Sequence, residues 1–453
     1  MGLAKWRIPV AALCALTAPG LLSPITCGAL GAPAAKSAPA ARGAARPFSA
    51  QDFYLHSGDR VVFYGDSITD QRLYTTYIES FCRSRFPRWH LTFVHSGWGG
   101  DRVPGGGGGK VDVRIDRDIL AYKPTVVTIC LGMNDGQYKP LDQTVLADFV
   151  HGYEHIVDRL KRELPGVRIT LLTAPAFDDV TRAPNFPGGY NGTLAALNDA
   201  VRELAQRTGV LVADTNAPLV DELKRAQEAY PTLASSLIPD RVHPSPGGHV
   251  VMAAAVLRAW KAPGLVATYT VDLKSGSVKG ANTSISGVKA ENGGIGFRAQ
   301  DLALPWPIDR GQVGNHDMDV ALHVTSIETD LNRYVLKAAG LTAPRYVLRV
   351  DDRVVGSMSR AELEKGVDLA DLSFYQPCMQ SREALGLIRK HNELHVQRWR
   401  AVQVPALNGG GITPEVQQKM DSLDAEERAV LAQIDQIIKP RAYHIQLRPA
   451  TAN

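Results

Sequence analysis

The sequence predicts an α/β fold, in which a mainly parallel sheet is covered by helices and followed by a second, β-rich and helical region. Short apolar runs and longer amphipathic stretches alternate from residue 61 to about residue 262, as in parallel sheets whose strands are connected by helices. Near residue 265 the pattern changes to alternating runs broken by Gly, Asn and Asp. The length of 453 residues also exceeds one ordinary core, so two domains are expected.

The first 46 residues have the composition of an export signal followed by an Ala/Pro/Gly-rich linker. Two basic residues precede the apolar run at residues 8–16, and small residues follow it. Pro19 and Pro24 interrupt the apolar character, which argues against a lasting transmembrane anchor. We therefore expect residues 1–46 to be a signal peptide and linker, and the protein to be secreted or periplasmic without a stable membrane span.

Charge and cysteine content exclude several classes of partner and scaffold. Residues 1–46 hold five of the 50 basic residues and none of the 46 acidic ones, which leaves 45 basic against 46 acidic residues. This balance gives no electrostatic reason to expect nucleic acid or anionic lipid as a partner. Outside this segment the cysteines are Cys82, Cys130 and Cys378. They are too widely spaced for a disulfide framework or a paired metal site, and Cys130 lies in an apolar run typical of a core.

The first strand is expected at residues 61–64, where four apolar or aromatic residues precede Gly65-Asp66-Ser67. Such a run predicts a buried strand that breaks into a turn at the glycine. The later strands of this sheet are expected at residues 91–94, 125–131, 167–172 and 210–213. Helices are expected at residues 74–86, 111–122, 142–164, 190–208, 217–230 and 246–260, and in the third of these the apolar positions recur every three or four residues.

The second region is expected to combine antiparallel strands with two amphipathic helices. Alternating apolar patterns predict strands at residues 269–273, 334–336, 346–350 and 443–447. The helices are identified by two apolar sets, Leu385, Ile388 and Trp399 in the first and Leu423, Val430, Leu431, Ile434 and Ile438 in the second. We expect domains at residues 47–264 and 265–453. The second has no recognisable acid/base set, so residues 1–264 are expected to retain the chemistry and the remainder to affect stability or polymer binding.

Ser67 is the first candidate for chemistry, because it follows a predicted strand. Open α/β sheets bind ligands at the carboxyl ends of their strands, where a helix start offers free N–H groups to negative charge. Gly-Asp-Ser is also a common turn or helix cap. The assignment of Ser67 as a nucleophile therefore needs further residues elsewhere in the chain.

Three further segments follow predicted strands or precede the last helix on the same edge of the sheet. The glycine-rich run at residues 96–101 allows close backbone approach and can aim the Gly100 N–H at an oxyanion. Asn134 offers a side-chain amide for the same purpose. Asp240 and His243 lie three residues apart in a loop. A serine nucleophile needs such a base, oriented by a carboxylate.

At these residues the chain resembles the SGNH/GDSL hydrolases, a family named for blocks that carry Ser, Gly, Asn and His. The four blocks occur in order within residues 58–262: Ser67 in Gly-Asp-Ser-Ile-Thr, Gly100 in Gly-Trp-Gly-Gly-Asp, Asn134 in Gly-Met-Asn-Asp and His243 in Asp-Arg-Val-His-Pro. The resemblance implies a flavodoxin-like three-layer α/β/α domain and a metal-free serine esterase that uses no cofactor. It implies catalytic Ser67, Asp240 and His243, and an oxyanion hole formed by the Ser67 and Gly100 N–H groups and the Asn134 amide.

The resemblance has two departures and one looser extension. The serine block has Ile68 where the family name has Leu, which leaves the chemistry in place. Where many relatives have Asn before the glycine block, this chain has His95 or Ser96, so the local support of the oxyanion loop is open. Residues 345–370 resemble the small β domain that follows some bacterial members.

Other polar and glycine-rich features are interpreted as structural. Gly105–Gly109 and Lys110 lack the Ser or Thr of a phosphate loop and are expected to form a mobile loop beside the site. The histidines without metal-ligand spacing are expected on the surface or in the core; they are His95, His151, His155 and His249. Three acidic residues are expected to brace the loops of the site; they are Asp66, Asp101 and Asp135.

The expected function is hydrolysis of a short acyl ester, such as acetyl on a polysaccharide. The segment at residues 177–191 mixes aromatic and hydrogen-bonding side chains, which suits sugar rings. Trp98 is either a sugar platform or a packing residue. Two alternatives stay open: a lipid or lysophospholipid esterase, and a carbohydrate-binding or scaffold protein with a relic hydrolase domain. The intact set of site residues argues against a relic, and the sequence does not indicate the oligomeric state.

Overall fold

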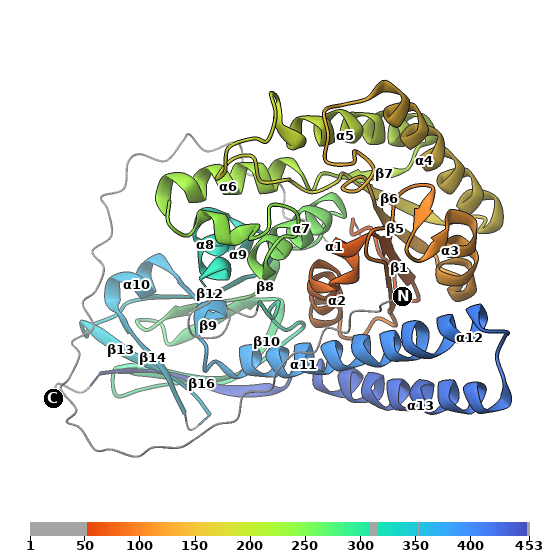
Figure 1. Cartoon of the computed structure of the whole chain (residues 1–453). Coiled ribbons are helices and arrows are strands. Elements are labelled where there is room, and N and C mark those ends of the chain that lie inside the picture. Colours follow the sequence, from red (N-terminus) through yellow and green to blue (C-terminus); the bar gives the residue numbers. More distant parts are fainter. Residues whose placement is uncertain (1–51, 309–315, 352, 451–453) are drawn as a thin grey trace, which may run out of the picture. The chain divides into compact units, whose positions relative to one another are not determined.

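Figure 1 shows the computed structural model, which describes residues 52–308, 316–351 and 353–450. The expected signal peptide and linker, residues 1–46, lie outside the described residues. The described residues form one compact unit. Within it we distinguish a first lobe around a parallel sheet and a second, β-rich lobe from which two long helices extend (Figure 1).

A five-stranded parallel sheet forms the centre of the first lobe, with strand order β2-β1-β5-β6-β7. Its strands are β1 (Arg60–Gly65), β2 (Thr92–Gly97), β5 (Val126–Cys130), β6 (Arg168–Leu172) and β7 (Leu211–Ala213). Each expected strand is present, and the flavodoxin-like α/β prediction is confirmed. Because β1 lies between β2 and β5 and the strand order reverses beside it, the loops after β1, β2 and β5 meet at one edge.

Helices cover both faces of this sheet, as the right-handed crossovers between parallel strands require. On one face α2 (Leu73–Arg85) packs against α7 (Pro246–Ala259) (Figure 1). On the other face α4 (Gln143–Glu163) packs against α5 (Gly189–Thr208). Asp142 caps the start of α4 by accepting from the Thr144 and Val145 amides. Two further helices complete the lobe, α3 (Val111–Asp118) and α6 (Ala217–Ala229).

The second lobe contains two sheets around a second hydrophobic core. The larger has the order β10-β11-β16-β13-β14, with β10 (Thr283–Glu291), β11 (Gly294–Asp301), β16 (Ala442–Pro449), β13 (Arg345–Val350) and β14 (Arg353–Ser359). The smaller has the order β15-β12-β8-β9, with β15 (Val367–Asp368), β12 (Arg333–Ala339), β8 (Leu265–Asp272) and β9 (Ser277–Ala281).

One expectation for the second lobe was wrong, because not all of its strands are antiparallel. β12 pairs with β8 in parallel. The chain between them passes through the helices α8 (Asp317–Val324) and α9 (Ile327–Leu331). This connection brings the chain back to the sheet so that β12 runs in the same direction as β8. Parallel strands need such a long crossover connection.

Residues beyond the expected boundary at 264 return to the core of the first lobe. Trp306 is buried in this core. Its ring meets the Phe81 ring edge-on, with the ring centres 5.6 Å apart, and its indole N–H donates to the Tyr77 carbonyl at 2.9 Å. The helices α8 and α9 add further apolar side chains to the same core, namely Met318, Val320, Ala321, Leu322, Ile327 and Leu331. A cut after residue 264 therefore removes part of the first core. Residues 1–264 therefore lack part of the core that supports the site and are not expected to carry the chemistry alone.

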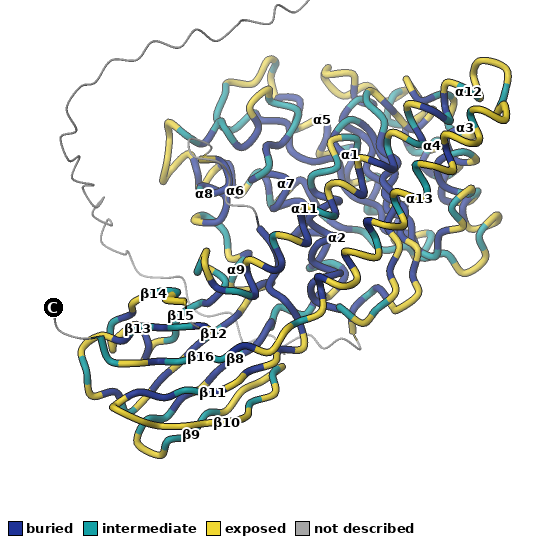
Figure 2. The backbone as a smooth tube through the Cα atoms, turned by 90° about the horizontal axis from the view of Figure 1, so that it is seen from below, coloured by how far each residue is buried: buried dark blue, intermediate teal, exposed yellow. Residues whose placement is uncertain are grey.

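The two long helices also pack on the first lobe. α11 (Gln376–Val396) pairs with α13 (Pro414–Ile437) and lies beside α2 and β2 (Figures 1 and 2). Trp399, expected in the first amphipathic helix, lies in a π-helical turn at Gln397–Gln403, which leads into α12 (Val404–Asn408). Because α2 has the sheet on one side and α11 on another, every α2 residue after Leu73 is buried (Figure 2).

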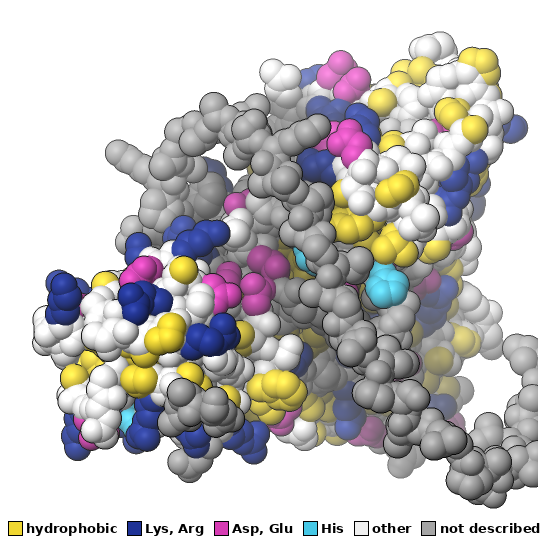
Figure 3. All heavy atoms as spheres, turned by 90° about the vertical axis from the view of Figure 1, so that its left-hand side faces the viewer, with side chains coloured by type: hydrophobic (Ala, Val, Ile, Leu, Met, Phe, Trp, Pro, Cys, Tyr) yellow, Lys and Arg dark blue, Asp and Glu magenta, His cyan; other side chains and the backbone are white. Residues whose placement is uncertain are grey.

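The surface of the second lobe is polar, with basic side chains. Figure 3 shows Lys and Arg side chains along the margin of this lobe. In the larger sheet Arg298 is exposed opposite His444 on the neighbouring strand, and Arg448 is exposed further along β16. No helix among the described residues is long and apolar enough to cross a membrane.

The position of Trp306 generates a prediction about stability. We expect Trp306→Ala to lower the free energy of unfolding by about 3–5 kcal/mol, because it leaves a cavity in the first core. Chemical denaturation followed by circular dichroism measures this loss. Phe374→Ala is the matched control, since the Phe374 side chain is 71% exposed. Equal effects of the two substitutions would contradict the packing described here.

Candidate active site

Ser67 is the first residue of the short helix α1 (Ser67–Asp70), directly after β1. Asp66 caps this helix by accepting a hydrogen bond from the Ile68 amide at 3.0 Å. The turn is tight, since a Cβ atom on Gly65 would lie 2.5 Å from the Cys130 carbonyl oxygen. Glycine is required here, and the tight turn places Ser67 at the carboxyl edge of the sheet.

The structure brings together three predicted residues that lie far apart in the sequence. The Ser67 Oγ atom is 2.8 Å from His243 Nε2, and His243 Nδ1 is 2.6 Å from Asp240 Oδ2. The other Asp240 oxygen accepts from the Val242 and His243 amides at 2.9 and 2.7 Å. Partial burial opposes ionisation of Asp240, but the hydrogen bonds from His243 and Val242 hold its pKa below the ordinary value. A carboxylate therefore faces one nitrogen of the imidazole, and a hydroxyl faces the other.

Arg241 holds the loop that carries Asp240 and His243, and sequence reasoning missed it. Its φ of 73° is unusual for a residue other than glycine. Its guanidinium donates to Asp179 Oδ1 at 2.8 Å and to the Asp178 carbonyl at 3.1 Å, and lies 5.0 Å from the centre of the Phe177 ring. The loop after β6 therefore anchors the histidine loop. No pattern in the sequence indicates this contact, because its partners lie about 60 residues away.

Three candidate hydrogen-bond donors lie on Ser67, Gly100 and Asn134, which follow the adjacent strands β1, β2 and β5. Among the described residues, neither the Ser67 amide nor the Gly100 amide has a hydrogen-bond acceptor. Gly100 has a φ of 77°, which a side chain would strain. Asn134 Nδ2 donates to the Asp101 carbonyl at 3.0 Å and keeps a second hydrogen for another acceptor. The Trp98 amide donates to the Gly65 carbonyl at 2.9 Å, which ties this loop to the end of β1.

Tyr138 orients the Asn134 amide and is a second residue that sequence reasoning missed. Its hydroxyl donates to Asn134 Oδ1 at 3.0 Å, so the NH₂ group is turned to the other side. The ring is 42% exposed and packs against Tyr190, with the ring centres 4.8 Å apart. Burial and the charges of Asp66 and Asp240 raise the pKa of Tyr138 to about 12, so the hydroxyl stays a donor.

The aromatic residues expected to face a substrate are mostly buried. Phe177 and Tyr190 have 5% and 1% exposure and form the backing of Tyr138. Trp98 is a packing residue, because the guanidinium groups of Arg400 and Arg117 lie 4.3 and 5.3 Å from its ring centre. Of the three packed rings Tyr138, Phe177 and Tyr190, Tyr138 is therefore the exposed one.

A buried arginine supports the loop that carries Gly100. Arg114 Nε donates to Asp101 Oδ2 at 2.7 Å and Nη2 to the Ser96 carbonyl at 2.8 Å, while Nη1 pairs with Asp118. Asp101 thus braces the loop, as expected. Its second oxygen accepts from the Gly108 amide at 3.2 Å. Residues 105–110, which were expected to form a mobile loop, form a small hairpin of β3 (Gly105–Gly106) and β4 (Gly109–Lys110).

Two histidines near the site are core residues, as expected. His95 is buried and its ring nitrogens contact Thr75 Oγ1 at 2.7 Å and Glu79 Oε2 at 3.1 Å. His249 contacts Gln71 Oε1 at 2.7 Å, and burial lowers its pKa to about 3, so its ring is neutral. In the part of the chain that the structure describes, no group of three His, Cys, Asp or Glu side chains is arranged to hold a metal ion.

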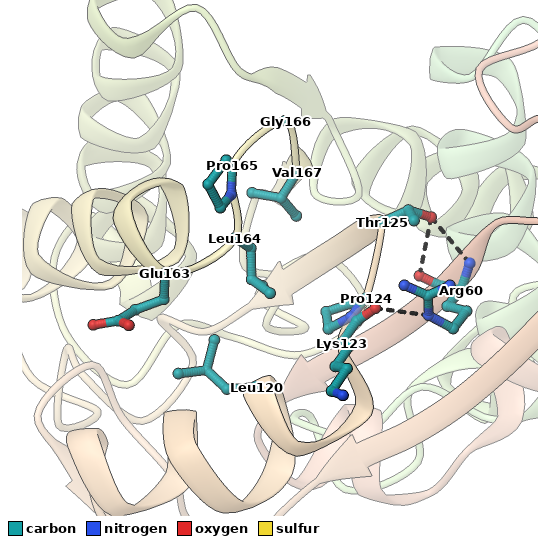
Figure 4. A pocket seen from close by; sticks show the side chains of 10 residues that line it. All are labelled: Arg60, Leu120, Lys123, Pro124, Thr125, Glu163, Leu164, Pro165, Gly166 and Val167. Atoms are coloured by element: carbon teal, nitrogen blue, oxygen red, sulfur yellow. Dashed lines mark hydrogen bonds between the residues drawn. The ribbon is translucent and has the colours of Figure 1, made fainter.

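A hollow of 530 Å³ lies on the opposite edge of the sheet and is separate from this site (Figure 4). Its lining includes Arg60, Lys123 and Thr125, which precede or begin the strands β1 and β5. In Figure 4 the Arg60 side chain donates to the Lys123 carbonyl, at 2.7 Å. These groups are at the amino ends of the strands, whereas Ser67 follows the carboxyl end of β1.

Comparison with known proteins gives one family match and several similar proteins. Residues 63–251 match the GDSL-like lipase/acylhydrolase family. An acetylxylan esterase from Geobacillus stearothermophilus is 28% identical over 223 residues, which are 45% of this chain and 94% of that esterase. The solved structure of a gut microbial diltiazem-metabolizing enzyme is 26% identical, covers 87% of this chain and 98% of its own, and has a TM-score of 0.77. The last match necessarily includes most of the second lobe.

The buried Asp66 generates a prediction about pH. Burial raises the pKa of Asp66 to about 8. The hydrogen bond from the Ile68 amide opposes this rise, and the negative charges of Asp135 and Asp101 add to it. Folded protein therefore keeps a proton that the unfolded chain loses above about pH 4, so stability falls as pH rises between these values. Asparagine also caps a helix but does not ionise.

We expect Asp66→Asn to remove part of this pH dependence. Between about pH 5 and about pH 8.5, the wild type should lose on the order of 4 kcal/mol more stability than the variant, because about 1.4 kcal/mol is lost per pH unit over about three units. Urea denaturation of both proteins at the two pH values measures the difference. Parallel losses in both proteins would show that Asp66 is already ionised in the folded state.

Proposed function

The chain belongs to the GDSL-like lipase/acylhydrolase family, whose members are also called SGNH hydrolases, and is a carboxylic ester hydrolase; from this premise we propose that it removes acetyl groups from carbohydrate through an acyl-enzyme on Ser67. The observation that carries the mechanism is the hydrogen-bonded series Ser67, His243 and Asp240, with contacts of 2.8 and 2.6 Å. This geometry suits transfer of the serine proton to the imidazole during attack.

In the proposed reaction His243 Nε2 takes the Ser67 proton as Oγ attacks the ester carbonyl. Asp240 stabilises the resulting imidazolium through Nδ1. The carbonyl oxygen becomes an oxyanion that accepts from the Ser67 amide, the Gly100 amide and the Asn134 side chain. His243 then donates the proton to the departing alcohol. Water, deprotonated by His243, attacks the acyl-enzyme and releases the free acid and Ser67.

The acetyl-carbohydrate assignment is supported by the chemistry around Ser67 and by one relative. The nearby polar groups include Asn134, Asp240 and Arg241, and the exposed ring is Tyr138. Sugar rings need hydrogen-bonding partners for their hydroxyls and stack their C–H faces on such rings. The match to an acetylxylan esterase over 94% of its length points to the same substrate class.

The two alternative functions have less support. A lipid esterase needs a long apolar groove beside the serine, but the large aromatic side chains Phe177 and Tyr190 are buried under Tyr138. A relic hydrolase domain would not need to maintain the contacts among Ser67, His243 and Asp240. The hydrogen bond that orients the Asn134 amide is intact as well.

We also propose that the protein is exported. This proposal rests on the basic and apolar pattern of residues 1–46 alone. An exported enzyme would meet polysaccharide esters outside the cytoplasm. Fractionation of the native host tests it, since recovery of the protein in the cytoplasm at full length would contradict export.

The mechanism predicts different kinetic losses for two kinds of residue. Ser67→Ala and His243→Ala should abolish turnover of p-nitrophenyl acetate and labelling by an organophosphonate. Asn134→Ala should lower kcat by about 10²–10³ with little change in KM, because its amide acts on the transition state. Steady-state kinetics of the three folded variants check this. Residual turnover of Ser67→Ala within about tenfold of the wild type would reject Ser67 as nucleophile.

The substrate class predicts a preference for short acyl groups. We expect kcat/KM on p-nitrophenyl esters to fall by at least about tenfold from C2 to C8, since a long apolar groove would instead gain roughly 0.8 kcal/mol per buried CH₂. Acetate release from acetylated xylooligosaccharides, measured beside the ester series, tests the carbohydrate directly. A rise of kcat/KM with chain length would favour the lipid alternative.

A further inference from the structure

The π-helical turn of the second lobe lies against the loop that carries Gly100. Trp399 and Arg400 belong to this turn, Gln397–Gln403. Trp399 is buried, and its indole N–H donates to Asp118 Oδ1 at 2.6 Å. Its ring meets the Trp98 ring edge-on, with the centres 5.5 Å apart. Trp98 is two residues before Gly100, so the turn contacts the backing of the candidate oxyanion hole directly.

Arg400 connects this turn to both sides of the candidate oxyanion hole. Its Nη1 atom lies 2.5 and 2.6 Å from the two carboxylate oxygens of Asp70, the last residue of α1. Asp70 Oδ2 also accepts from the Gly99 amide at 3.3 Å. The Arg400 guanidinium lies over the Trp98 ring, 4.3 Å from its centre. One arginine thus contacts the helix that begins at Ser67 and the loop that contains Gly100.

We propose that Arg400 is a positioning residue that sets the Gly100 amide relative to the Ser67 amide. Through Asp70 it fixes α1 against Gly99, and through Trp98 it fixes the loop from its other side. The inference rests on the proposed acyl-enzyme mechanism at Ser67 but not on the carbohydrate substrate. The second lobe thereby takes part in the hydrolase site without contributing a group that touches substrate.

Two features separate this role from general stabilisation of the fold. Arg400 and Asp70 side chains are 31% and 20% exposed, and partly exposed ion pairs contribute little to folding stability. A displaced oxyanion donor, in contrast, acts on the transition state and lowers kcat. Arg72 lies 3.9 Å from Asp70 and still supplies a positive charge when Arg400 is removed. A loss of kcat in Arg400→Ala then reflects displaced donor geometry, because the Asp70 carboxylate still has a cation nearby.

The central test compares Arg400→Ala with Arg398→Ala in the full chain. Arg398 lies in the same turn but pairs with Asp424 of α13 at 2.9 Å. We expect Arg400→Ala to lower kcat on p-nitrophenyl acetate by about tenfold, with KM changed by less than about twofold. Arg398→Ala should leave both constants within about twofold of the wild type. Thermal unfolding of both variants shows that the comparison is made on folded protein.

Four further measurements distinguish positioning from a structural effect. Affinity for a boronic acid, which becomes tetrahedral on adding the Ser67 oxygen, should fall in Arg400→Ala by the same factor as kcat. Added guanidinium should restore part of its kcat, and Arg400→Lys should fall between the alanine variant and the wild type. In Asp70→Asn, the additional loss caused by Arg400→Ala should be smaller than in the wild type, because the two side chains act together.

The outcomes separate failure of this inference from failure of the proposed mechanism. If Ser67→Ala is inactive and Arg400→Ala keeps kcat within about twofold, the positioning role is wrong and the mechanism stands. A rise in KM with unchanged kcat would also overturn it, since Arg400 would then bind substrate. If Arg400→Ala unfolds, Arg400→Lys carries the test, and equal kcat in folded Arg400→Lys and the wild type overturns the proposal.

Discussion

The buried guanidinium of Arg114 is the interaction on which one side of the candidate site depends. It is fully buried and paired with Asp101 and Asp118, and it also donates to the Ser96 carbonyl. Removing one partner of such a buried pair leaves an uncompensated charge, which typically costs 3–5 kcal/mol. Asp101 in turn accepts from Gly108, and Asp118 accepts from Trp399. The Gly100 loop, the glycine-rich hairpin and the second lobe are therefore connected through one side chain.

The second lobe also satisfies polar groups that the first lobe buries. Glu79 on α2 is fully buried and pairs with Arg83 at 2.8 Å and with His95 at 3.1 Å, while His391 of α11 lies 3.8 Å away. Burial alone would raise the pKa of Glu79, but Arg83 and the histidines lower it to about 2. Thr76 of the same helix accepts from Asn392 of α11 at 2.9 Å. This shared burial explains why a division at residue 264 does not separate independent structures.

The site itself combines residues held by local bonds with residues held across the fold. The turn at Gly65 and the cap at Asp66 are local, and they suffice to place Ser67 at the end of β1. The position of His243 depends on Arg241 and its partners in the loop after β6. The orientation of the Asn134 amide depends on Tyr138. Catalysis at Ser67 would therefore respond to substitutions that do not touch substrate.

The family blocks and the first sheet could be predicted from the sequence because their signals are local. Each strand and helix of the first sheet is encoded by a short stretch of chain, and the helix boundaries are predicted to within a few residues. The four family blocks are equally short; they carry Ser67, Gly100, Asn134 and His243. Parallel topology then brings strand ends to one edge, so nearness of these residues follows from the fold class. Burial of Cys130 follows from the apolar run around it in the same way.

Only the tertiary structure decided which groups cover the site and which lie within it. Three contacts join segments that lie about 65 to 330 residues apart in the chain. They are the parallel pairing of β8 with β12, the packing of Trp306 in the first core and the ion pair of Arg400 with Asp70. The exposure of Tyr138 above the buried Phe177 and Tyr190 depends on how three separate segments pack. Local patterns determine strands, helices and turns, whereas partners distant in the chain leave no local periodicity, and their contacts exist only once the chain has folded.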